Sequence, residues 1–242
     1  MENNKEYQKW LEVVEKDGMN LGDVPEDLIN KELCEVAVKD FPYALQYVPE
    51  ELHTPELCMV AVQKDGWNLK YVALELRTKE LCELAVQKSG RALKFVPEDL
   101  KTLELCEVAV KEYGRALADV PEDLKTKAMC DIAVIKNGHA LKFVPYELRT
   151  KEICEIAVTE NGHALGFVPE GVMTIELCEI AVRESGEYLY YVPEQFRTFE
   201  LCEIAVKDSG SWAIEFVPKE FKEELAEKYD IDLPKKIDER GR

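Results

Sequence analysis

Eight cysteines recur along the chain at a constant interval of 24 residues, and this period is the strongest constraint on the fold. A fixed period of this size is typical of an array of stacked repeats. Trp10 lies 24 residues before Cys34, and Gly18 to Leu28 keep the same register, so the array has nine repeats. The cysteines are Cys34, Cys58, Cys82, Cys106, Cys130, Cys154, Cys178 and Cys202.

The first half of each repeat predicts a helix of about three turns. Counted from each Cys, positions −1, 0, +2, +3 and +4 are apolar and positions −2, +1 and +5 are mostly polar, so only one narrow stripe is expected to face water. The helix is expected to end near +8, where a glycine can adopt the left-handed conformation of a C-terminal cap. A threonine four residues before the Cys is expected to cap the helix start, at Thr54, Thr78, Thr102, Thr126, Thr150, Thr174 and Thr198. The glycines are Gly18, Gly66, Gly90, Gly114, Gly138, Gly162, Gly186 and Gly210.

The second half of each repeat predicts another short helix. Arg91–Val96 has apolar residues spaced 0, 1, 3 and 4 apart, and Pro97 then starts one more turn. A leucine-rich-repeat horseshoe is the competing architecture, but the chain lacks its asparagine position and its L-x-x-L-x-L rhythm. The predicted fold class is therefore an all-α solenoid of nine tandem 24-residue two-helix repeats, of either hand.

Because one repeat cannot bury its own apolar face, the ends of the array must differ from its middle. We expect a single repeat domain over 1–242, with an N-terminal capping repeat at 1–30 and eight Cys-containing repeats at 31–221. A capping helix and charged tail follow at 222–242. Lys9 and Glu12 replace apolar residues at the first end, which favours a monomer over self-assembly through an uncapped end.

The cysteines are interpreted as buried, reduced thiols. Helices stacked at roughly 8–10 Å place their Cα atoms beyond the reach of a disulfide, and evenly spread single cysteines cannot converge on a metal ion. We therefore expect no cofactor and no metal. Reduced thiols, together with the lack of an apolar signal or membrane segment, predict a cytoplasmic protein.

The repeat unit Thr-x-Glu-Leu-Cys-Glu-Ile-Ala-Val, followed by Gly-x-Ala-Leu-x-Phe-Val-Pro-Glu-x-Leu, resembles the repeats of the bacterial and viral family called domain of unknown function 4116. The resemblance extends from about Trp10 to Phe221. It implies a repeat architecture and carries over no activity or binding residue.

The chain is strongly acidic, with 31 Lys and Arg against 49 Asp and Glu and a net charge of −18. This charge argues against direct binding to nucleic acid or to an anionic membrane, and predicts that a charged partner is basic. Paired carboxylates at −2 and +1 form an acidic ridge that either imitates DNA or is a solvated face. Favourable pairs such as Glu35 with Lys39 and Glu107 with Lys111 support the second interpretation. The ridge is represented by Glu80, Glu83, Glu104, Glu107, Glu152 and Glu155.

Position +9, directly after the glycine, changes its chemistry while its neighbours keep theirs. Such positions either form the binding surface of a solenoid or vary freely in solvent, and Tyr, Trp and Arg are enriched at binding hot spots. The candidate partner-binding residues are Tyr43, Trp67, Arg91, Arg115, His139, His163 and Glu187, and Ser211 ends the series.

No residue pattern predicts an enzyme. His139 and His163 are too few to hold a metal tightly, no Cys is placed beside a His, and the glycines are single and far apart. His53 occupies the place of Arg77 and Arg149 and is interpreted as a polar residue flanking a helix. The predicted function is a non-catalytic repeat scaffold for protein–protein interaction, and the alternative is an acidic DNA-mimic inhibitor of a nucleic-acid-binding protein.

Overall fold

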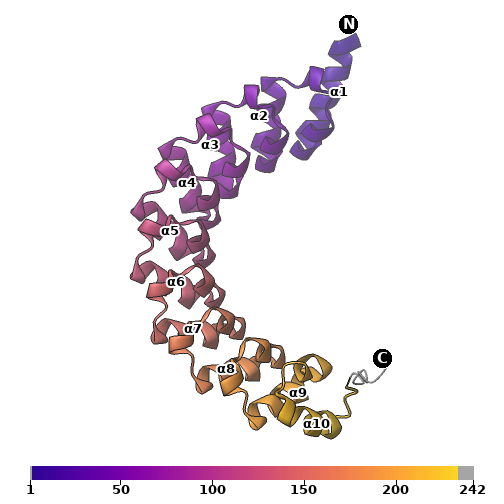
Figure 1. Cartoon of the computed structure of the whole chain (residues 1–242). Coiled ribbons are helices and arrows are strands. Elements are labelled where there is room, and N and C mark those ends of the chain that lie inside the picture. Colours follow the sequence, from indigo (N-terminus) through magenta and orange to yellow (C-terminus); the bar gives the residue numbers. More distant parts are fainter. Residues whose placement is uncertain (1, 234–242) are drawn as a thin grey trace, which may run out of the picture. The chain divides into compact units, whose positions relative to one another are not determined.

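A computed structural model describes residues 2–233, with side chains from Lys5 onward. The tail from Lys235 to Arg242 lies outside the described residues. Residues 2–233 form helices and turns without a strand, and the helices follow one another repeat by repeat (Figure 1). The predicted all-α solenoid is confirmed, and the leucine-rich-repeat alternative, which needs a strand in each repeat, is wrong for this part of the chain.

Each repeat contains one α-helix and two 3₁₀-helices. The predicted second helix is confirmed in the tighter 3₁₀ form, and the turn after the proline is a second 3₁₀ segment. The α-helices are α1 (Glu2–Lys16), α2 (Lys31–Asp40), α3 (Pro55–Lys64), α4 (Lys79–Lys88), α5 (Leu103–Glu112), α6 (Lys127–Lys136), α7 (Lys151–Glu160), α8 (Ile175–Glu184), α9 (Phe199–Ile214) and α10 (Lys219–Lys228). The long 3₁₀-helices are η1 (Gly18–Asp23), η3 (Pro42–Tyr47), η5 (Gly66–Tyr71), η7 (Gly90–Phe95), η9 (Gly114–Asp119), η11 (Gly138–Phe143), η13 (Gly162–Phe167) and η15 (Gly186–Tyr191). The short ones are η2 (Glu26–Leu28), η4 (Glu50–Leu52), η6 (Leu74–Leu76), η8 (Glu98–Leu100), η10 (Glu122–Leu124), η12 (Tyr146–Leu148), η14 (Glu170–Val172) and η16 (Glu194–Phe196).

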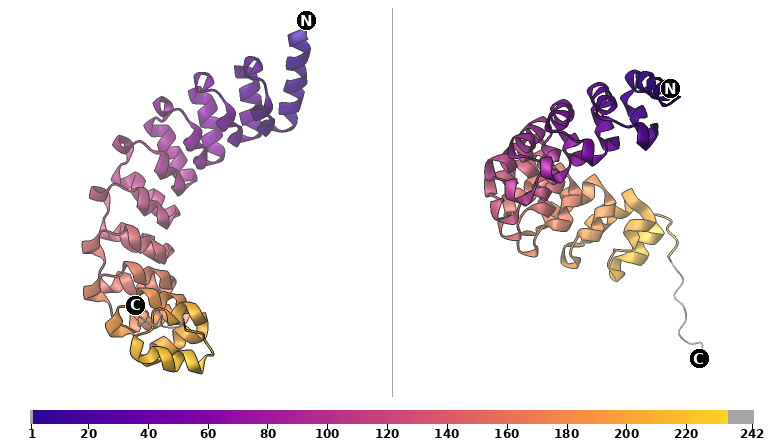
Figure 2. Two further views of the ribbon diagram at one scale, coloured as in Figure 1. Left: turned by 45° about the vertical axis from the view of Figure 1, so that its right-hand side comes forward. Right: turned by 90° about the horizontal axis from the view of Figure 1, so that it is seen from above.

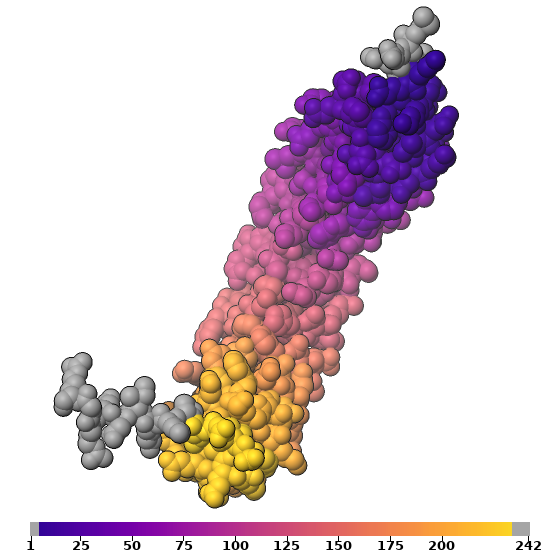
Figure 3. Space-filling model, turned by 90° about the vertical axis from the view of Figure 1, so that its right-hand side faces the viewer, coloured from indigo at the N-terminus to yellow at the C-terminus, as the bar shows by residue number. Residues whose placement is uncertain are grey.

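The chain divides into two compact units, Met1–Ala133 and Val134–Arg242. In the first unit, α1 to α5 lie side by side in sequence order, and the long 3₁₀-helices η1 to η9 form a second layer against them (Figures 1 and 2). In the second unit, α7 to α9 and η11 to η15 repeat this two-layer arrangement. Side chains of successive repeats meet across the surface of each unit (Figure 3).

The predicted threonine caps are confirmed in all but one repeat. Each Oγ1 accepts a hydrogen bond from the backbone N–H three residues later, at 3.2–3.4 Å. Asn30 caps α2 in the same way, at 3.0 Å from the Leu33 nitrogen. Thr150 makes no such bond, and its buried Oγ1 has no hydrogen-bond partner within residues 2–233.

The predicted left-handed glycine caps are wrong in all repeats except the last. Among the described glycines, only Gly210 has a positive φ, of 52°. The α-helix ends two residues earlier than predicted, as at Lys88, and the extended residue Ser89 turns the chain, so no left-handed residue is needed. Gly90 then begins a 3₁₀-helix and lies against the next repeat.

The glycine is required because two backbones meet there. A Cβ placed on Gly90 would lie 2.3 Å from the carbonyl oxygen of Ala109 in α5, and the corresponding distance at Gly66 to the Ala85 oxygen is 2.0 Å. No side chain fits this space. Any substitution of these glycines must push the next repeat away.

Some of these glycines also bind the next repeat through their N–H groups. Gly186 donates to Asp208 Oδ2 at 2.8 Å, and Gly18 donates to Asp40 Oδ2 at 3.0 Å. The Gly186 N–H, with the Ser209 hydroxyl, holds the pKa of the Asp208 carboxyl below its usual range. The acceptors lie at position +6 of the following α-helix, so the bond joins the two layers of adjacent repeats.

We predict that Gly90→Ala destabilises the protein by about 1–3 kcal/mol, because the added Cβ overpacks the contact with Ala109. Gly171→Ala is the matched control, since a Cβ at Gly171 meets nothing within 4 Å, and its effect should stay within about 0.5 kcal/mol. Urea unfolding followed by circular dichroism measures both. Equal effects of the two substitutions would contradict the close-approach explanation.

The core consists of the cysteines with the apolar residues at −1, +3 and +4, all of which are buried. The prediction that only one stripe of the α-helix faces water is wrong at +2. Val60, Val108, Ile156 and Ile180 at this position have 36–39% of their surface exposed. The reason is that the 3₁₀ layer covers only one side of each α-helix, and +2 lies beyond its edge.

A cation five residues before the Cys joins one repeat to the next. Arg77 donates from Nε to the Val72 oxygen at 3.0 Å and from Nη1 to the Phe95 oxygen at 2.8 Å, across the repeat boundary. Arg149 and Arg197 make the same two kinds of bond. These donors satisfy carbonyl groups at the ends of the 3₁₀-helices, which is more than the flanking role that the sequence suggested.

His53 replaces this cation once, and the residue opposite it changes as well. His53 Nε2 lies 3.2 Å from the Val48 oxygen, and Nδ1 accepts a hydrogen bond from the Ala73 N–H at 3.3 Å. Ala73 stands where other repeats have a proline, which has no N–H to donate. The histidine acceptor and the alanine donor therefore form a matched pair.

We predict that His53→Arg and Ala73→Pro each cost about 1 kcal/mol alone, because the first orphans the Ala73 N–H and the second orphans His53 Nδ1. The double variant recreates the arrangement of Arg77 and Pro97 and removes both unpaired groups. A double-mutant cycle by urea unfolding should show a favourable coupling of about 1 kcal/mol. Strictly additive effects would show that the pair is not coupled.

The C-terminal end is closed by α10. Leu225 is buried, and the ring of Phe221 packs edge-on against Phe199 at 5.6 Å between centroids, so the predicted apolar stripe of this helix is used. The extra residue of the ninth repeat is accommodated at Gly210, where the helical path of α9 is interrupted. Arg197 still reaches the Phe216 oxygen, at 2.7 Å.

Candidate functional site

The residues at position +9 are the second residues of the long 3₁₀-helices, and the structure brings several of them together. In the first unit, the Arg91 guanidinium lies 4.5 Å from the ring centroid of Trp67 and 5.7 Å from that of Tyr113. Trp67 also meets Phe95 of the next repeat edge-on, at 4.8 Å. This edge of the first unit therefore alternates aromatic rings with a cation.

The two ends of this series behave differently. The Tyr43 hydroxyl donates to Asp65 Oδ2, and this bond raises the pKa of Tyr43 above its usual value. Arg115 is exposed and makes no hydrogen bond, ion pair or ring contact within residues 2–233. Arg115 is thus placed on the same edge without joining the stacked group.

In the second unit, His139 and His163 face each other with ring centroids 4.9 Å apart. Tyr191 approaches His163 edge-on at 5.2 Å, and its hydroxyl lies 3.0 Å from His163 Nε2. Glu187 is exposed beside Tyr188. Burial, together with the charges of Glu184 and Glu187, raises the pKa of Tyr188.

The histidine pair has no third ligand. The described part of the chain contains no cluster of three or more His, Cys, Asp or Glu side chains that would hold a metal ion. His163 Nδ1 is buried without a hydrogen-bond partner there. The geometry of the pair is that of two packed rings.

The acidic ridge lies on the α-helix layer, away from the 3₁₀-helices. Glu83 pairs with Lys79 at 3.8 Å and Glu155 pairs with Lys151 at 3.6 Å. The predicted pair of Glu35 with Lys39 is wrong, because Glu35 lies 3.7 Å from Lys31. Exposed pairs of this kind stabilise little, but they neutralise part of the ridge. The other ridge residues, Glu80, Glu104, Glu107 and Glu152, lie on α4, α5 and α7 in equivalent positions.

The sequence model of one protein family matches the chain six times in tandem, over residues 10–53, 30–77, 54–101, 78–125, 127–172 and 174–222. Its description is "Domain of unknown function (DUF4116)". The chain belongs to this family. The matches at 30, 54 and 78 start 24 residues apart, and each spans about two structural repeats. No curated protein and no solved structure matches the chain.

The thiols of this DUF4116 array are all free and buried, as predicted. Burial raises the pKa of each from 9.0 to about 11. A thiol with this pKa carries almost no thiolate near neutral pH, and the thiolate is the reactive form. The cysteines are small apolar core residues.

We predict that native thiols do not react with Ellman's reagent at pH 8 and that all eight react in guanidinium chloride. Because the folded pKa lies above the unfolded one, the thiols stabilise the fold below pH 9, and this contribution is lost as the pH rises towards 11. The free energy of unfolding should therefore fall over that range. Replacing Cys58 and Cys178 by alanine should reduce the slope against pH, and an unchanged slope would contradict the pKa assignment.

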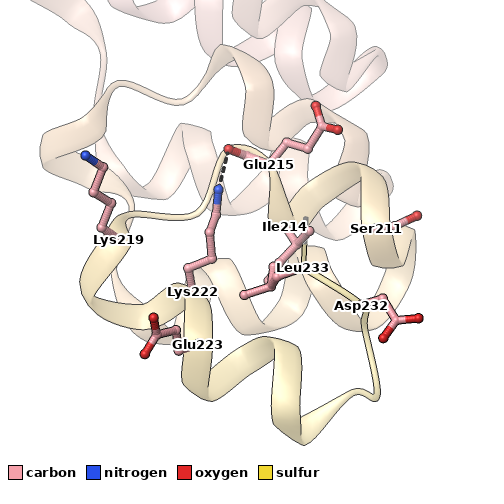
Figure 4. Close-up of a pocket in the computed structure, with 8 residues that line it drawn as sticks. All are labelled: Ser211, Ile214, Glu215, Lys219, Lys222, Glu223, Asp232 and Leu233. Carbon is pink, nitrogen blue, oxygen red and sulfur yellow. Dashed lines mark hydrogen bonds between the residues drawn. The ribbon is translucent and has the colours of Figure 1, made fainter. Parts of the chain in front are cut away.

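A cavity of about 550 Å³ lies at the C-terminal end, between the last turn of α9, α10 and residues 231–233 (Figure 4). Ile214 and Leu233 lie at its centre, and Lys222 Nζ donates to the Glu215 carbonyl oxygen at 3.0 Å. Lys219, Glu223 and Asp232 point in different directions around it. The walls do not converge on one chemical group, so this cavity is not the candidate site.

Sequence reasoning missed the aromatic residues at +12 and +13, which were assigned to the second helix as apolar residues. Phe95, Phe167 and Tyr191 contact the +9 side chain of the preceding repeat, and Tyr190 and Trp212 are more than half exposed. The spacing of +9 and +13 by four residues was the signal that could have found them. None of the described helices is long and apolar enough to cross a membrane.

Proposed function

We propose that this chain is a non-catalytic scaffold that binds another protein through the edge formed by its long 3₁₀-helices. One observation carries the proposal. The framework positions repeat without change, whereas the +9 side chains differ and lie next to one another, as Arg91 does on Trp67 at 4.5 Å. Stacked Trp, Tyr and Arg side chains supply a large contact area with little loss of side-chain entropy on binding.

A non-catalytic role is supported by the chemistry of the most reactive residue types. The thiols are protonated and buried, and the two histidines face each other across ring contacts. Reduced thiols also suit a cytoplasmic protein. We propose a monomer, because Lys9 and Glu12 place charge at the first end of the array.

The partner is expected to be a protein with a basic surface, because the net charge of −18 repels phosphate groups. The salt bridges on the α-helix layer weigh against the ridge as a phosphate mimic, since Lys79 and Lys151 interrupt its negative charge. Partner binding through the 3₁₀ edge and inhibition through the ridge involve separate residues. They can be tested separately.

We predict that Trp67→Ser with Arg91→Ser removes partner capture in a quantitative pull-down from cell lysate, because serine, the residue at position 211, keeps the backbone and deletes the stacked pair. The matched control changes Glu80, Glu83, Glu104, Glu107, Glu152 and Glu155 to Gln and should retain the same partner.

Loss of capture only in the glutamine variant, with displacement of the partner by duplex DNA, would contradict the proposal and favour mimicry. Circular dichroism melting verifies that both variants are folded.

A further inference from the structure

Six aromatic rings form a connected row across the 3₁₀ edge of the second unit. Successive ring centroids lie 4.9, 5.2, 5.0, 5.2 and 5.6 Å apart. The row passes through four consecutive repeats, and we call it the aromatic ladder. Its members are, in order, His139, His163, Tyr191, Tyr190, Phe216 and Trp212.

The ladder is accessible at one end and anchored at the other. Tyr190 and Trp212 have 55% and 52% of their surface exposed, whereas the other rings are half-buried. Tyr191 lies over Gly166, where a Cβ would be only 2.8 Å from its ring. The tyrosine ring therefore rests directly on the backbone of the preceding repeat, which fixes its position without a flexible side chain beneath it.

The rings leave notches between them. From His163 onward, neighbouring planes meet at 64–74°, in edge-to-face contacts. Such a row offers a series of apolar angles at regular intervals. Aromatic-lined surfaces of this kind receive the rings of proline residues in extended, proline-rich segments.

The spacing of the ladder suits a polyproline II segment. One turn of this helix has three residues and advances about 9 Å, and stacked helical repeats advance roughly 8–10 Å. A proline at every third residue would thus meet one repeat after another. The segment has no internal hydrogen bonds, so its carbonyl groups are free to accept from the Tyr190 hydroxyl and Trp212 Nε1.

The charge around the ladder selects the rest of the ligand. The segments 162–167, 186–191 and 210–217 contain no Lys or Arg, whereas they contain Glu187 and Glu215, both exposed. The corresponding edge of the first unit carries Arg91 and Arg115. A ligand on the ladder is therefore expected to carry Lys or Arg between its prolines, and phosphate groups are disfavoured.

We propose that the aromatic ladder binds a basic, proline-rich segment of a partner protein in the polyproline II conformation. This inference rests on the proposed scaffold function and identifies its ligand class. The ladder residues belong to the second unit, whereas Trp67 and Arg91 belong to the first.

The experiment is a fluorescence-anisotropy titration of a fluorescein-labelled (Pro-Pro-Arg)₄ peptide with the full chain. We expect saturable binding that weakens at least about tenfold in Tyr190→Ala and Trp212→Ala, as for hot-spot aromatic residues. Both side chains are more than half exposed, so the variants should fold, and circular dichroism verifies this. Tyr146→Ala is the matched control, because Tyr146 is 67% exposed in η12 and lies off the ladder.

Two further peptides separate charge from conformation. (Gly-Ser-Arg)₄ has the same charge without the stiff conformation, and (Pro-Pro-Glu)₄ has the conformation with the opposite charge, so both should bind at least about tenfold more weakly. Absence of binding by (Pro-Pro-Arg)₄, equal binding by (Gly-Ser-Arg)₄, or insensitivity to Tyr190→Ala and Trp212→Ala would overturn the proposal. Tighter binding of cellohexaose or of oligo-dT to the same rings would overturn it as well.

Failure here is distinguishable from failure of the scaffold function. If the peptide does not bind but capture still depends on Trp67 and Arg91, the scaffold function stands and the ligand class is wrong. If capture is also unaffected by those residues, both proposals are wrong.

Discussion

The structure depends on a contact between two backbones. The glycine that begins each long 3₁₀-helix lies against the carbonyl group of an alanine in the next α-helix, as Gly90 does against Ala109. This contact leaves no room for a side chain, so it sets how closely the repeats approach. The cysteines fit the same requirement, because a buried thiol is small and apolar. Close approach in turn brings side chains on the 3₁₀ edge within ring contact of one another, as at His139 and His163.

A second constraint is the satisfaction of buried carbonyl groups where one repeat meets the next. The array meets it with different donors. Arg77 bridges the Val72 and Phe95 oxygens, and Lys101 Nζ reaches the Asp119 oxygen at 2.9 Å. His53 has a single donor and instead accepts from Ala73. The residue type varies while the number of unpaired groups stays low, which is what buried polar groups require.

Much of this architecture could be predicted from the sequence, because a period shows which residues share an environment. The α-helices, the threonine caps and the buried thiols follow from it. The period does not show what each residue faces in the neighbouring repeat. Glycine at +8 fits either a left-handed cap or a close approach, and only the position of Ala109 distinguishes them. For the same reason, the exposure of Val60 at +2 and the ladder contacts of Tyr190 could not be predicted.

The two layers of each repeat have separate roles in this account. The α-helix layer carries the salt-bridged acidic ridge, and the 3₁₀ layer carries the rings and Arg91 that we propose as the binding edge. Residues that bind can therefore change without disturbing the contacts that hold the repeats together. This arrangement explains how one framework presents cationic stacking in one unit and an acidic aromatic ladder in the other.

Hydroxyl-radical footprinting of the chain with its captured partner tests this division most directly, because aromatic and sulfur side chains react readily. Trp67, Tyr190 and Trp212 report on the 3₁₀ layer, and Met59, exposed in α3, reports on the α-helix layer. The account predicts that the partner protects at least one of the three aromatic reporters while Met59 keeps its full reactivity. Protection of Met59 with unchanged oxidation of all three rings would contradict it.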